Sequence, residues 1–357
     1  MHRYSRRTIL AVALSPTLHT ADATKPQSRY TTPHKYGQLV LASSRDSNAF
    51  DSRSVDCPFV FQDRGLFYMT YIGWDGTGYQ TGLASSVDLL QWRKLGLILA
   101  RDPSSPVTRY NVAMNWILRE PALRSPGRLR KLHGRFLGVY HAYPNSGYES
   151  GPAVIGLCWS HDLVHWEVEQ PCLKPADGAA WERGGLYKPC LVEHGGTYYL
   201  FYNAKNEAAR GWREQTGVAT STDLKSWERY EANPLLSNGG PGSWDERFAS
   251  DPCVLIDGST WVMFYYGLDA RGKARDLLAT APSPFRFRKV DEILVDVGPQ
   301  GSVDETYAHK PSVVWHDGAL YHYYCAVAGR YPNETRGISV SRSRPWSRAS
   351  HGVDTGR

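Results

Sequence analysis

The chain has 357 residues and a formal charge of +6, with 21% charged and 41% hydrophobic residues. This balance suits a globular protein with enough sequence for one large or two ordinary domains, and no motif typical of nucleic-acid binding is present. Aromatic residues reach 12%, which favours β-structure and provides flat surfaces on which sugar rings stack.

The N-terminus has the features of a bacterial export signal. Arg6 and Arg7 precede a short apolar stretch, and Ala21 to Ala23 offer a small-residue cleavage site. The apolar stretch is too short to span a bilayer, and we expect no membrane contact after the signal is removed. We therefore expect a twin-arginine-like signal peptide at 1–25, a folded domain at 26–348 that works in the periplasm or outside the cell, and a disordered tail at 349–357.

A repeat follows. Five stretches share a polar residue, a proline, an apolar strand, a turn that usually contains glycine, and an aromatic strand. The prolines recur roughly every 60 residues and are Pro58, Pro121, Pro189, Pro252 and Pro311. A third strand with small residues follows each copy, and three copies end in S-x-D-L-x-x-W at Trp92, Trp166 and Trp227.

Short β-units repeated five times are typical of a β-propeller, in which each blade buries its faces against its neighbours. A large irregular β-sandwich would not account for the phased tryptophan endings. The sequence therefore predicts an all-β protein, a five-bladed β-propeller in a single domain. The expected blades I to V are 50–100, 112–172, 180–235, 245–292 and 303–348.

The residues beside the repeated prolines are charged. Glu120, Lys188, Asp251 and Lys310 each directly precede their proline, and Asp56 lies one residue further back from Pro58. The first strand of each blade lines the axis of a propeller, so we expect these side chains to meet in a polar pocket at one end of the axis. The alternative is that they pair as buried salt bridges and close the hole.

Further polar and aromatic residues lie close to these strand starts. They are Glu246, Arg247, Glu305, His309, Trp116, Trp181, Tyr187 and Tyr307. Acids, bases and aromatic rings gathered at one place suit an oligosaccharide or polysaccharide ligand, and paired acid and base groups suit glycoside cleavage. The six cysteines lack zinc-ligand spacing and are expected as free thiols. We expect no cofactor, although an axial structural cation such as calcium is compatible with the pattern.

These motifs resemble the five-bladed β-propeller glycosidases, the group that contains glycoside hydrolase families 43, 32, 62, 117 and 130. The resemblance covers residues 50–348 and rests on the acid–Pro strand starts, on FYMTYIG, YYLFYNA and WVMFYYG, and on the DL-x-x-W endings. It implies that Asp56 is the general base of an inverting enzyme or the nucleophile of a retaining one. It also implies that Glu120 and Asp251 tune a pKa or bind the sugar.

A resemblance to family 43 implies a glutamate as general acid at the start of blade III. This chain has Lys188 at that position. Family 117 enzymes are similar in using a late histidine instead, which here corresponds to His309. Glu305 and Glu246 are the other candidates for the acid.

Lys188, Arg247 and Lys310 are expected to bind hydroxyls or an acidic substituent, or to hold phosphate if the protein resembles the phosphorylases of family 130. The resulting prediction is an exported glycoside hydrolase that acts on plant or algal oligosaccharides or polysaccharides, by inversion. A non-catalytic carbohydrate-binding propeller and a glycoside phosphorylase remain alternatives, and the oligomeric state is open.

Overall fold

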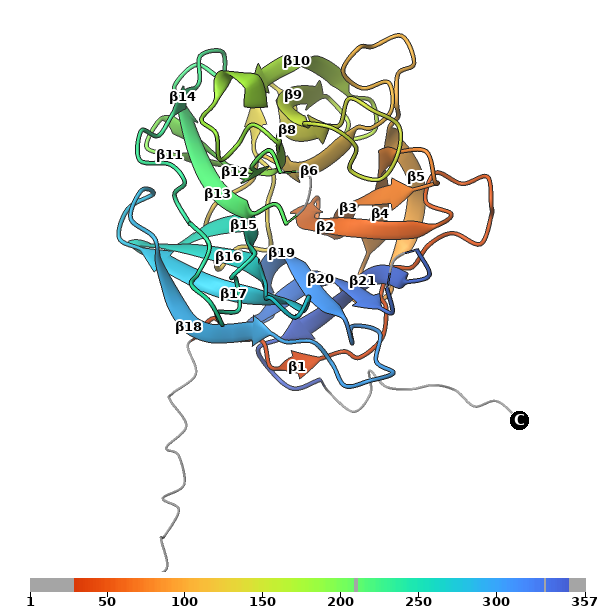
Figure 1. Ribbon diagram of the computed structural model, residues 1–357. Coiled ribbons are helices and arrows are strands. Elements are labelled where there is room, and N and C mark those ends of the chain that lie inside the picture. The colour runs from red at the N-terminus through yellow and green to blue at the C-terminus, as the bar shows by residue number, and fades with distance from the viewer. Residues whose placement is uncertain (1–28, 209–210, 331, 347–357) are drawn as a thin grey trace, which may run out of the picture.

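The computed structural model describes residues 29–208, 211–330 and 332–346. The expected signal peptide and tail lie outside these residues. Within them the chain forms five antiparallel β-sheet units arranged around a central axis (Figure 1). The prediction of a five-bladed β-propeller is confirmed, and the units follow the sequence repeat.

The strands have the following bounds. Blade I contains β2 (Ser54–Asp63), β3 (Leu66–Trp74), β4 (Tyr79–Ser86) and β5 (Arg93–Leu99). Blade II contains β6 (Ala113–Ile117), β7 (Lys131–Leu132), β8 (Arg135–Ala142), β9 (Val154–Ser160) and β10 (Glu167–Leu173). A 3₁₀ turn, η1 (Pro175–Asp177), leads into blade III, which contains β11 (Gly185–His194), β12 (Thr197–Lys205), β13 (Glu214–Ser221) and β14 (Glu228–Arg229). Blade IV contains β15 (Phe248–Asp257), β16 (Thr260–Leu268), β17 (Ala274–Ala281) and β18 (Arg288–Val295). Blade V contains β19 (Tyr307–His316), β20 (Ala319–Ala328) and β21 (Thr335–Arg342).

The N-terminal strand β1 (His34–Lys35) completes blade V. It pairs antiparallel with β21, with His34 opposite Arg342 and Lys35 opposite Ser341. The last blade is therefore built from both ends of the chain, which ties the ring together (Figure 1).

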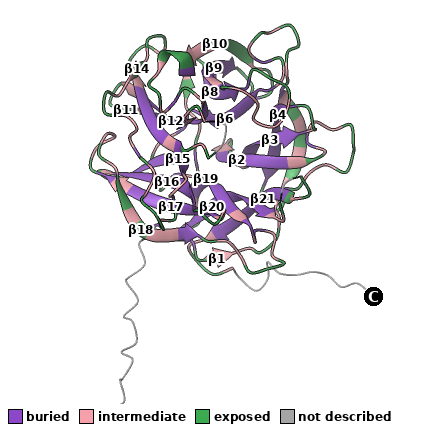
Figure 2. Cartoon of the chain, viewed as in Figure 1, coloured by how far each residue is buried: buried purple, intermediate pink, exposed green. Residues whose placement is uncertain are grey.

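Burial follows the position of each strand in its blade (Figure 2). The first three strands are almost wholly buried, as in β4 and β15, because neighbouring blades cover both faces. The outer strand β5 alternates exposed and partly buried residues, as expected of a strand with one face in water.

Four blades share a buried clasp formed by an acid, a tyrosine and a cation. In blade I, Asp51 accepts from the hydroxyl of Tyr71 at 3.2 Å and pairs with Lys94 at 2.5 Å. The corresponding sets are Glu182, Tyr202 and Arg229 in blade III, Asp245, Tyr265 and Lys289 in blade IV, and Asp304, Tyr324 and Lys35 in blade V. These acids link the strands of one blade.

None of the described helical segments is long and apolar enough to cross a membrane.

Candidate active site

The first strand of each blade contains an irregularity at its axial end. The registers of β2, β11, β15 and β19 shift at the residue before proline, which bulges out of the ladder. These residues, Cys57, Lys188, Asp251 and Lys310, all have positive φ between 50° and 67°. Such a backbone is unfavourable for side chains other than glycine, so the surrounding structure holds it in place. The bulge turns each side chain toward the axis.

In blade II the shift falls at Asn115, between Met114 and Trp116. The side chains that meet on the axis therefore come from Cys57, Asn115, Lys188, Asp251 and Lys310. The expected ring of five charges is wrong at two positions, since Asp56 lies one residue before the bulge. Glu120 lies beyond β6, where its carboxylate accepts from Ser125 at 2.8 Å and pairs with Arg128 at 3.6 Å.

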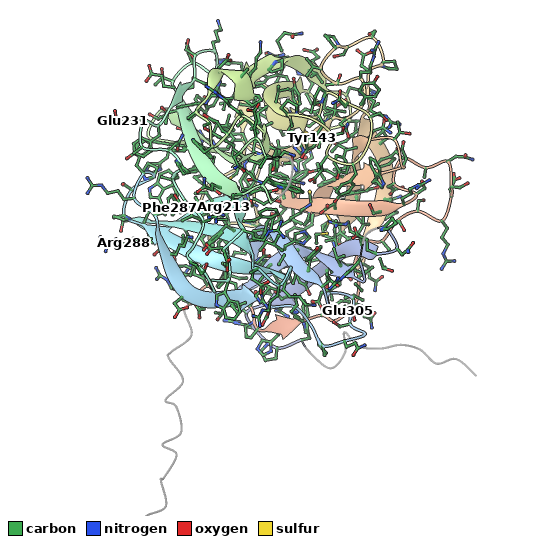
Figure 3. All side chains as sticks on the ribbon, in the orientation of Figure 1. Tyr143, Arg213, Glu231, Phe287, Arg288 and Glu305 are labelled. Carbon is green, nitrogen blue, oxygen red and sulfur yellow. The ribbon has the colours of Figure 1, made fainter. Side chains whose placement is uncertain are left out.

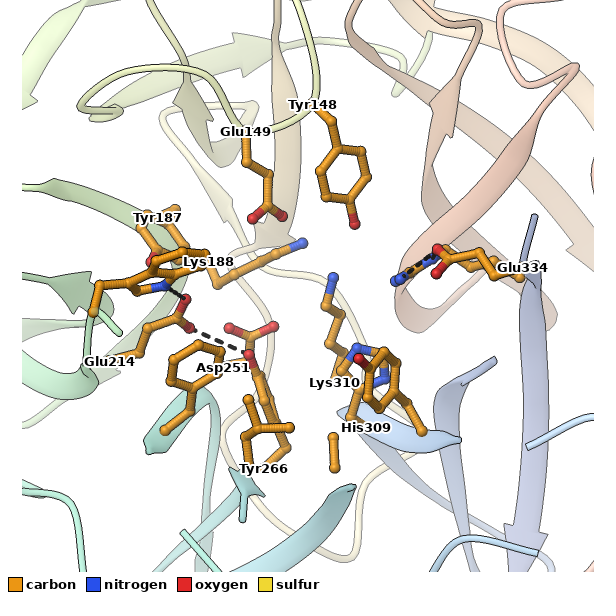
Figure 4. A pocket seen from close by; sticks show the side chains of 16 residues that line it. Tyr148, Glu149, Tyr187, Lys188, Glu214, Asp251, Tyr266, His309, Lys310 and Glu334 are labelled. Carbon is orange, nitrogen blue, oxygen red and sulfur yellow. Dashed lines mark hydrogen bonds and ion pairs between the residues drawn. The ribbon is translucent and has the colours of Figure 1, made fainter. Parts of the chain in front are cut away.

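A pocket of about 220 Å³ opens at this end of the axis (Figure 4). Its charged and polar lining consists of Glu149, Lys188, Glu214, Asp251, His309, Lys310, Glu334 and Arg336. Its aromatic lining consists of Tyr148, Tyr187, Trp212, Phe248, Tyr266 and Tyr307. Polar groups beside aromatic faces are typical of a sugar-binding site, because the rings stack on the sugar and the polar groups bind its hydroxyls.

Asp56 lies behind this lining, with a side-chain exposure of 4%. One carboxylate oxygen accepts from the ammonium of Lys310 at 2.6 Å and from the guanidinium of Arg336 at 2.9 Å, and the other accepts from the amide of Cys57. Burial raises its pKa, but the positive charges of Lys310 and Arg336 outweigh burial and hold the pKa well below its usual range. Asp56 is thus an ionised counter-ion that is not part of the pocket wall.

Glu214, the first residue of β13, is held by four donors. One of its oxygens accepts from Asn203, Ser250 and Tyr266 at 2.9–3.2 Å. The other accepts from the indole of Trp212 at 3.0 Å. Donors on both oxygens hold the Glu214 carboxyl in position in the pocket wall.

Asp251 shares a donor with Glu214. The amide nitrogen of Asn203 lies 3.1 Å from a carboxylate oxygen of each. The other oxygen of Asp251 has no hydrogen-bond partner among the described residues. Burial raises the pKa of Asp251 to about 7, against the opposing effect of Lys188. Lys188 is buried nearby, where its ammonium donates to the thiol of Cys57, and burial lowers its pKa to about 8.

Glu149 enters the pocket from the loop between β8 and β9. Its carboxyl lies on the far side of Lys188 from Asp251 in Figure 4. Burial of the carboxyl raises its pKa, with Lys310 opposing and Glu214 adding to the shift. Glu149 also has a φ of 50°, a strained backbone of the kind found at functional sites. A carboxyl whose pKa is raised by burial, in the same pocket as a carboxyl held by several hydrogen-bond donors, suits acid–base chemistry.

His309 lies in the pocket wall but is unsuited to donate a proton. Its Nδ1 lies 3.0 Å from the carbonyl oxygen of Cys325, which can only accept, so Nδ1 carries the hydrogen. Burial and the charges of Lys310 and Arg336 lower the pKa of the imidazole well below its usual value. His309 is therefore neutral, and its Nε2 is a hydrogen-bond acceptor.

The other predicted site residues are divided between the pocket and the framework. Tyr187 and Tyr307 line the pocket as expected. Glu305 and Glu246 instead accept backbone amides of Gly301 and Gly242 in equivalent turns, and neither lines the pocket. Figure 3 labels Glu305 near the lower edge of the molecule.

Three further candidates also lie outside the pocket wall. Trp116 is buried with Arg119 over its ring at 4.9 Å, and Trp181 stacks on Tyr202. Arg247 lies over Phe248 and is absent from the pocket lining.

A second cavity of about 420 Å³ lies beside the pocket. The two share Tyr148, Glu149 and Trp212. Glu149 therefore stands at the boundary between two adjoining spaces.

Glu149, Glu214 and Arg336 were not anticipated. A polar residue within the first two positions of the third strand in blades III and V, EQTGVATS and TRGISVS, is the signal that would have found the last two.

The described residues contain no group of three potential metal ligands, and the absence of a cofactor or axial cation stays a prediction. All six cysteines are free.

The chain is similar to several known proteins. A structure described as a complex of BT0996 with RGII superposes with a TM-score of 0.77 at 28% identity, and the match covers 92% of this chain and 94% of that protein. An uncharacterized protein of Mycobacterium tuberculosis is 26% identical over 254 residues, or 68% of this chain and 78% of its own length. A 1,2-beta-oligomannan phosphorylase of Thermoanaerobacter is 24% identical over 199 residues, which span 49% of this chain and 57% of that protein.

The model of glycosyl hydrolases family 43 matches residues 138–352, more than half of the sequence. The match runs from β8 of blade II through blade V and includes Glu149, Glu214 and every axial residue from Lys188 onward. The chain belongs to glycosyl hydrolase family 43, and it is a glycoside hydrolase.

Proposed function

We propose that this protein hydrolyses a glycosidic bond at the axial pocket, with Glu149 as proton donor and Glu214 as the ionised carboxylate. The observation that supports this most strongly is the contrast between their environments. Burial raises the pKa of Glu149, whereas the Glu214 carboxyl accepts hydrogen bonds from Asn203, Trp212, Ser250 and Tyr266.

The chemistry follows from this contrast. Glu149 transfers its proton to the glycosidic oxygen as the bond to the anomeric carbon breaks. Glu214 stabilises the positive charge that develops on the sugar, and it then either deprotonates an attacking water or bonds to the anomeric carbon. Asp251 is coupled to Glu214 through Asn203, so its protonation tunes the reacting carboxylate.

Asp56 and His309 take different roles from those that the resemblance implied. Asp56 fixes Lys310 and Arg336 in the pocket wall, where these cations bind hydroxyls. His309 contributes an acceptor to the same wall. Glu120, Glu246 and Glu305 have no part in this proposal because they lie outside the pocket.

The pocket volume of about 220 Å³ is below the 300–1,000 Å³ of sites for drug-sized ligands. It suits one sugar ring, so we propose removal of a terminal sugar. RGII is the first substrate to test, because a similar structure is described as its complex. Inversion and export of the mature enzyme are also proposed. Inversion is supported by the resemblance to inverting propeller enzymes, and export by the paired arginines of the N-terminus.

The test is hydrolysis of plant and algal oligosaccharides by the purified protein, with the product anomer followed by NMR. Glu149→Gln and Glu214→Gln should each lower kcat at least 100-fold, the lower end of the range for acid–base catalysis. Glu305→Gln is the matched control and should retain activity, because Glu305 lies outside the pocket. Full activity in both pocket variants would refute the proposal.

Phosphorolysis is the second candidate, favoured by the similarity to a 1,2-beta-oligomannan phosphorylase. The pocket does contain Lys310 and Arg336, but both are paired with Asp56 and are not free to neutralise phosphate. Hydrolysis is therefore preferred. A requirement for phosphate and release of a sugar 1-phosphate would establish phosphorolysis instead.

A further inference from the structure

We propose that the second cavity binds the leaving-group sugar and that Lys205 recognises an anionic substituent on it, a carboxylate or a sulfate ester. This inference rests on the proposed function, because it takes the axial pocket to bind the sugar on the other side of the cleaved bond.

The position of Glu149 defines which cavity is which. A proton donor must reach the oxygen between the cleaved sugar and its leaving group. Glu149 lines both cavities, so the scissile bond lies where they meet. Since Glu214 and Asp251 line the axial pocket and not the second cavity, the sugar that reacts lies in the axial pocket and the leaving group extends into the second cavity.

Lys205 is the last residue of β12 and faces this boundary. It is paired in register with Glu214 on β13 and with Gly185 on β11. Its ammonium lies 5.9, 5.6 and 5.7 Å from the ring centroids of Tyr143, Tyr187 and Trp212. Three aromatic faces hold the ammonium in place without removing its charge.

Lys205 has no carboxylate within ion-pair distance among the described residues. The cations of the axial pocket differ, since Lys310 pairs with Asp56 and Arg336 pairs with both Asp56 and Glu334. A charge that is held in position in a cavity wall and not neutralised is available to a ligand.

The rest of the second cavity adds positive charge. Arg183 lines it, and its guanidinium contacts the carbonyl of Gly178 at 3.4 Å and no described carboxylate. Glu207 is the opposing carboxylate of the lining. Neither Lys205 nor Arg183 pairs with a described carboxylate, and burial raises the pKa of Glu149, which disfavours its negative charge. The two unpaired cations therefore favour an anionic sugar in this cavity.

Isothermal titration calorimetry tests this with simple probes. The probes are galacturonate, glucuronate and mannuronate, their methyl esters, and the 6-sulfates of galactose and glucose beside the parent sugars. At least one uronate or sulfate should bind about tenfold more tightly than its neutral partner, as expected for a hydrogen bond to a charged group. Which series shows the preference distinguishes a carboxylate from a sulfate.

Three variants locate the effect. Lys205→Met should abolish the preference, Lys205→Arg should retain most of it, and Lys225→Met on the exposed turn after β13 should leave it unchanged. Thermal unfolding confirms that each variant is folded. The proposal is overturned if no anionic probe binds more tightly than its neutral partner, or if Lys205→Met keeps the preference. Because binding is measured without turnover, this result is independent of whether the protein hydrolyses any substrate tested.

Discussion

The ammonium of Lys310 lies 2.6 Å from a carboxylate oxygen of Asp56, and both side chains are almost fully buried beside the axial pocket. This pairing joins blade V to blade I, its neighbour in the ring. It also determines what Asp56 can do, because a carboxylate whose oxygens accept from two cations and an amide has little freedom to attack a sugar or a water.

Replacing Asp56 by Asn should therefore destabilise the fold. Lys310 and Arg336 would remain buried without their shared counter-ion, which costs about 3–5 kcal/mol in the free energy of unfolding. Urea denaturation measures this loss. The double variant Asp56→Asn/Lys310→Met should recover part of it, because it removes one of the unpaired cations. If Asp56→Asn is as stable as the wild type and loses only turnover, Asp56 is the reacting carboxylate that the resemblance implied.

Asp251 should make stability depend on pH. Because burial raises its pKa from 3.8 to about 7, the folded protein retains a proton that the unfolded chain releases in this interval. The free energy of unfolding therefore falls as pH rises from 3.8 to about 7. Asp251→Asn lacks this dependence and can still accept from Asn203.

Relative to the wild type, Asp251→Asn should gain on the order of 2–4 kcal/mol between pH 4 and pH 8, at about 1.36 kcal/mol per pKa unit. Thermal unfolding across this range gives the comparison, with the exposed Asp46→Asn as control. A difference from wild type that does not change with pH would show that Asp251 is not buried as an acid.

The closure of the ring should depend on Lys35. Its ammonium pairs with Asp304 at 2.6 Å, which also accepts from Tyr324 at 2.8 Å. Lys35→Met leaves the buried Asp304 without its cation and should lower the free energy of unfolding by about 1–3 kcal/mol. Lys94→Met and Lys289→Met break the same clasp in blades I and IV and provide a calibrated comparison. An unchanged stability in Lys35→Met alone would show that β1 does not close blade V.

The sequence was sufficient for the fold because each blade carries its own signals. Asp88 and its counterparts accept the backbone amides of the turn, and the indole of Trp92 donates to the carbonyl of Leu89. These contacts are local, so their spacing along the chain predicts the blade limits. The pairing of β1 with β21 in blade V could not be predicted from local spacing, because the two strands lie at opposite ends of the sequence.

The active-site prediction was less complete because some of the site residues lie outside the repeated pattern. Lys188, Asp251 and Lys310 each precede a proline at a bulge, and that pattern located them. In blade II the bulge falls at Asn115 without a proline after it, so Pro121 led to Glu120 instead. Glu149 belongs to a loop outside the repeat, and only the folded ring brings it into the same pocket as Glu214.

The most direct test of the central claim is how Glu149→Gln responds to the leaving group. A 4-nitrophenol leaving group needs little protonation, whereas a sugar leaving group needs the donor. On the substrate sugar identified by screening, Glu149→Gln should lose at least 100-fold in kcat with a natural oligosaccharide but less than tenfold with the 4-nitrophenyl glycoside. Glu214→Gln should lose activity equally on both. An equal loss with both substrates in Glu149→Gln would contradict its assignment as the proton donor.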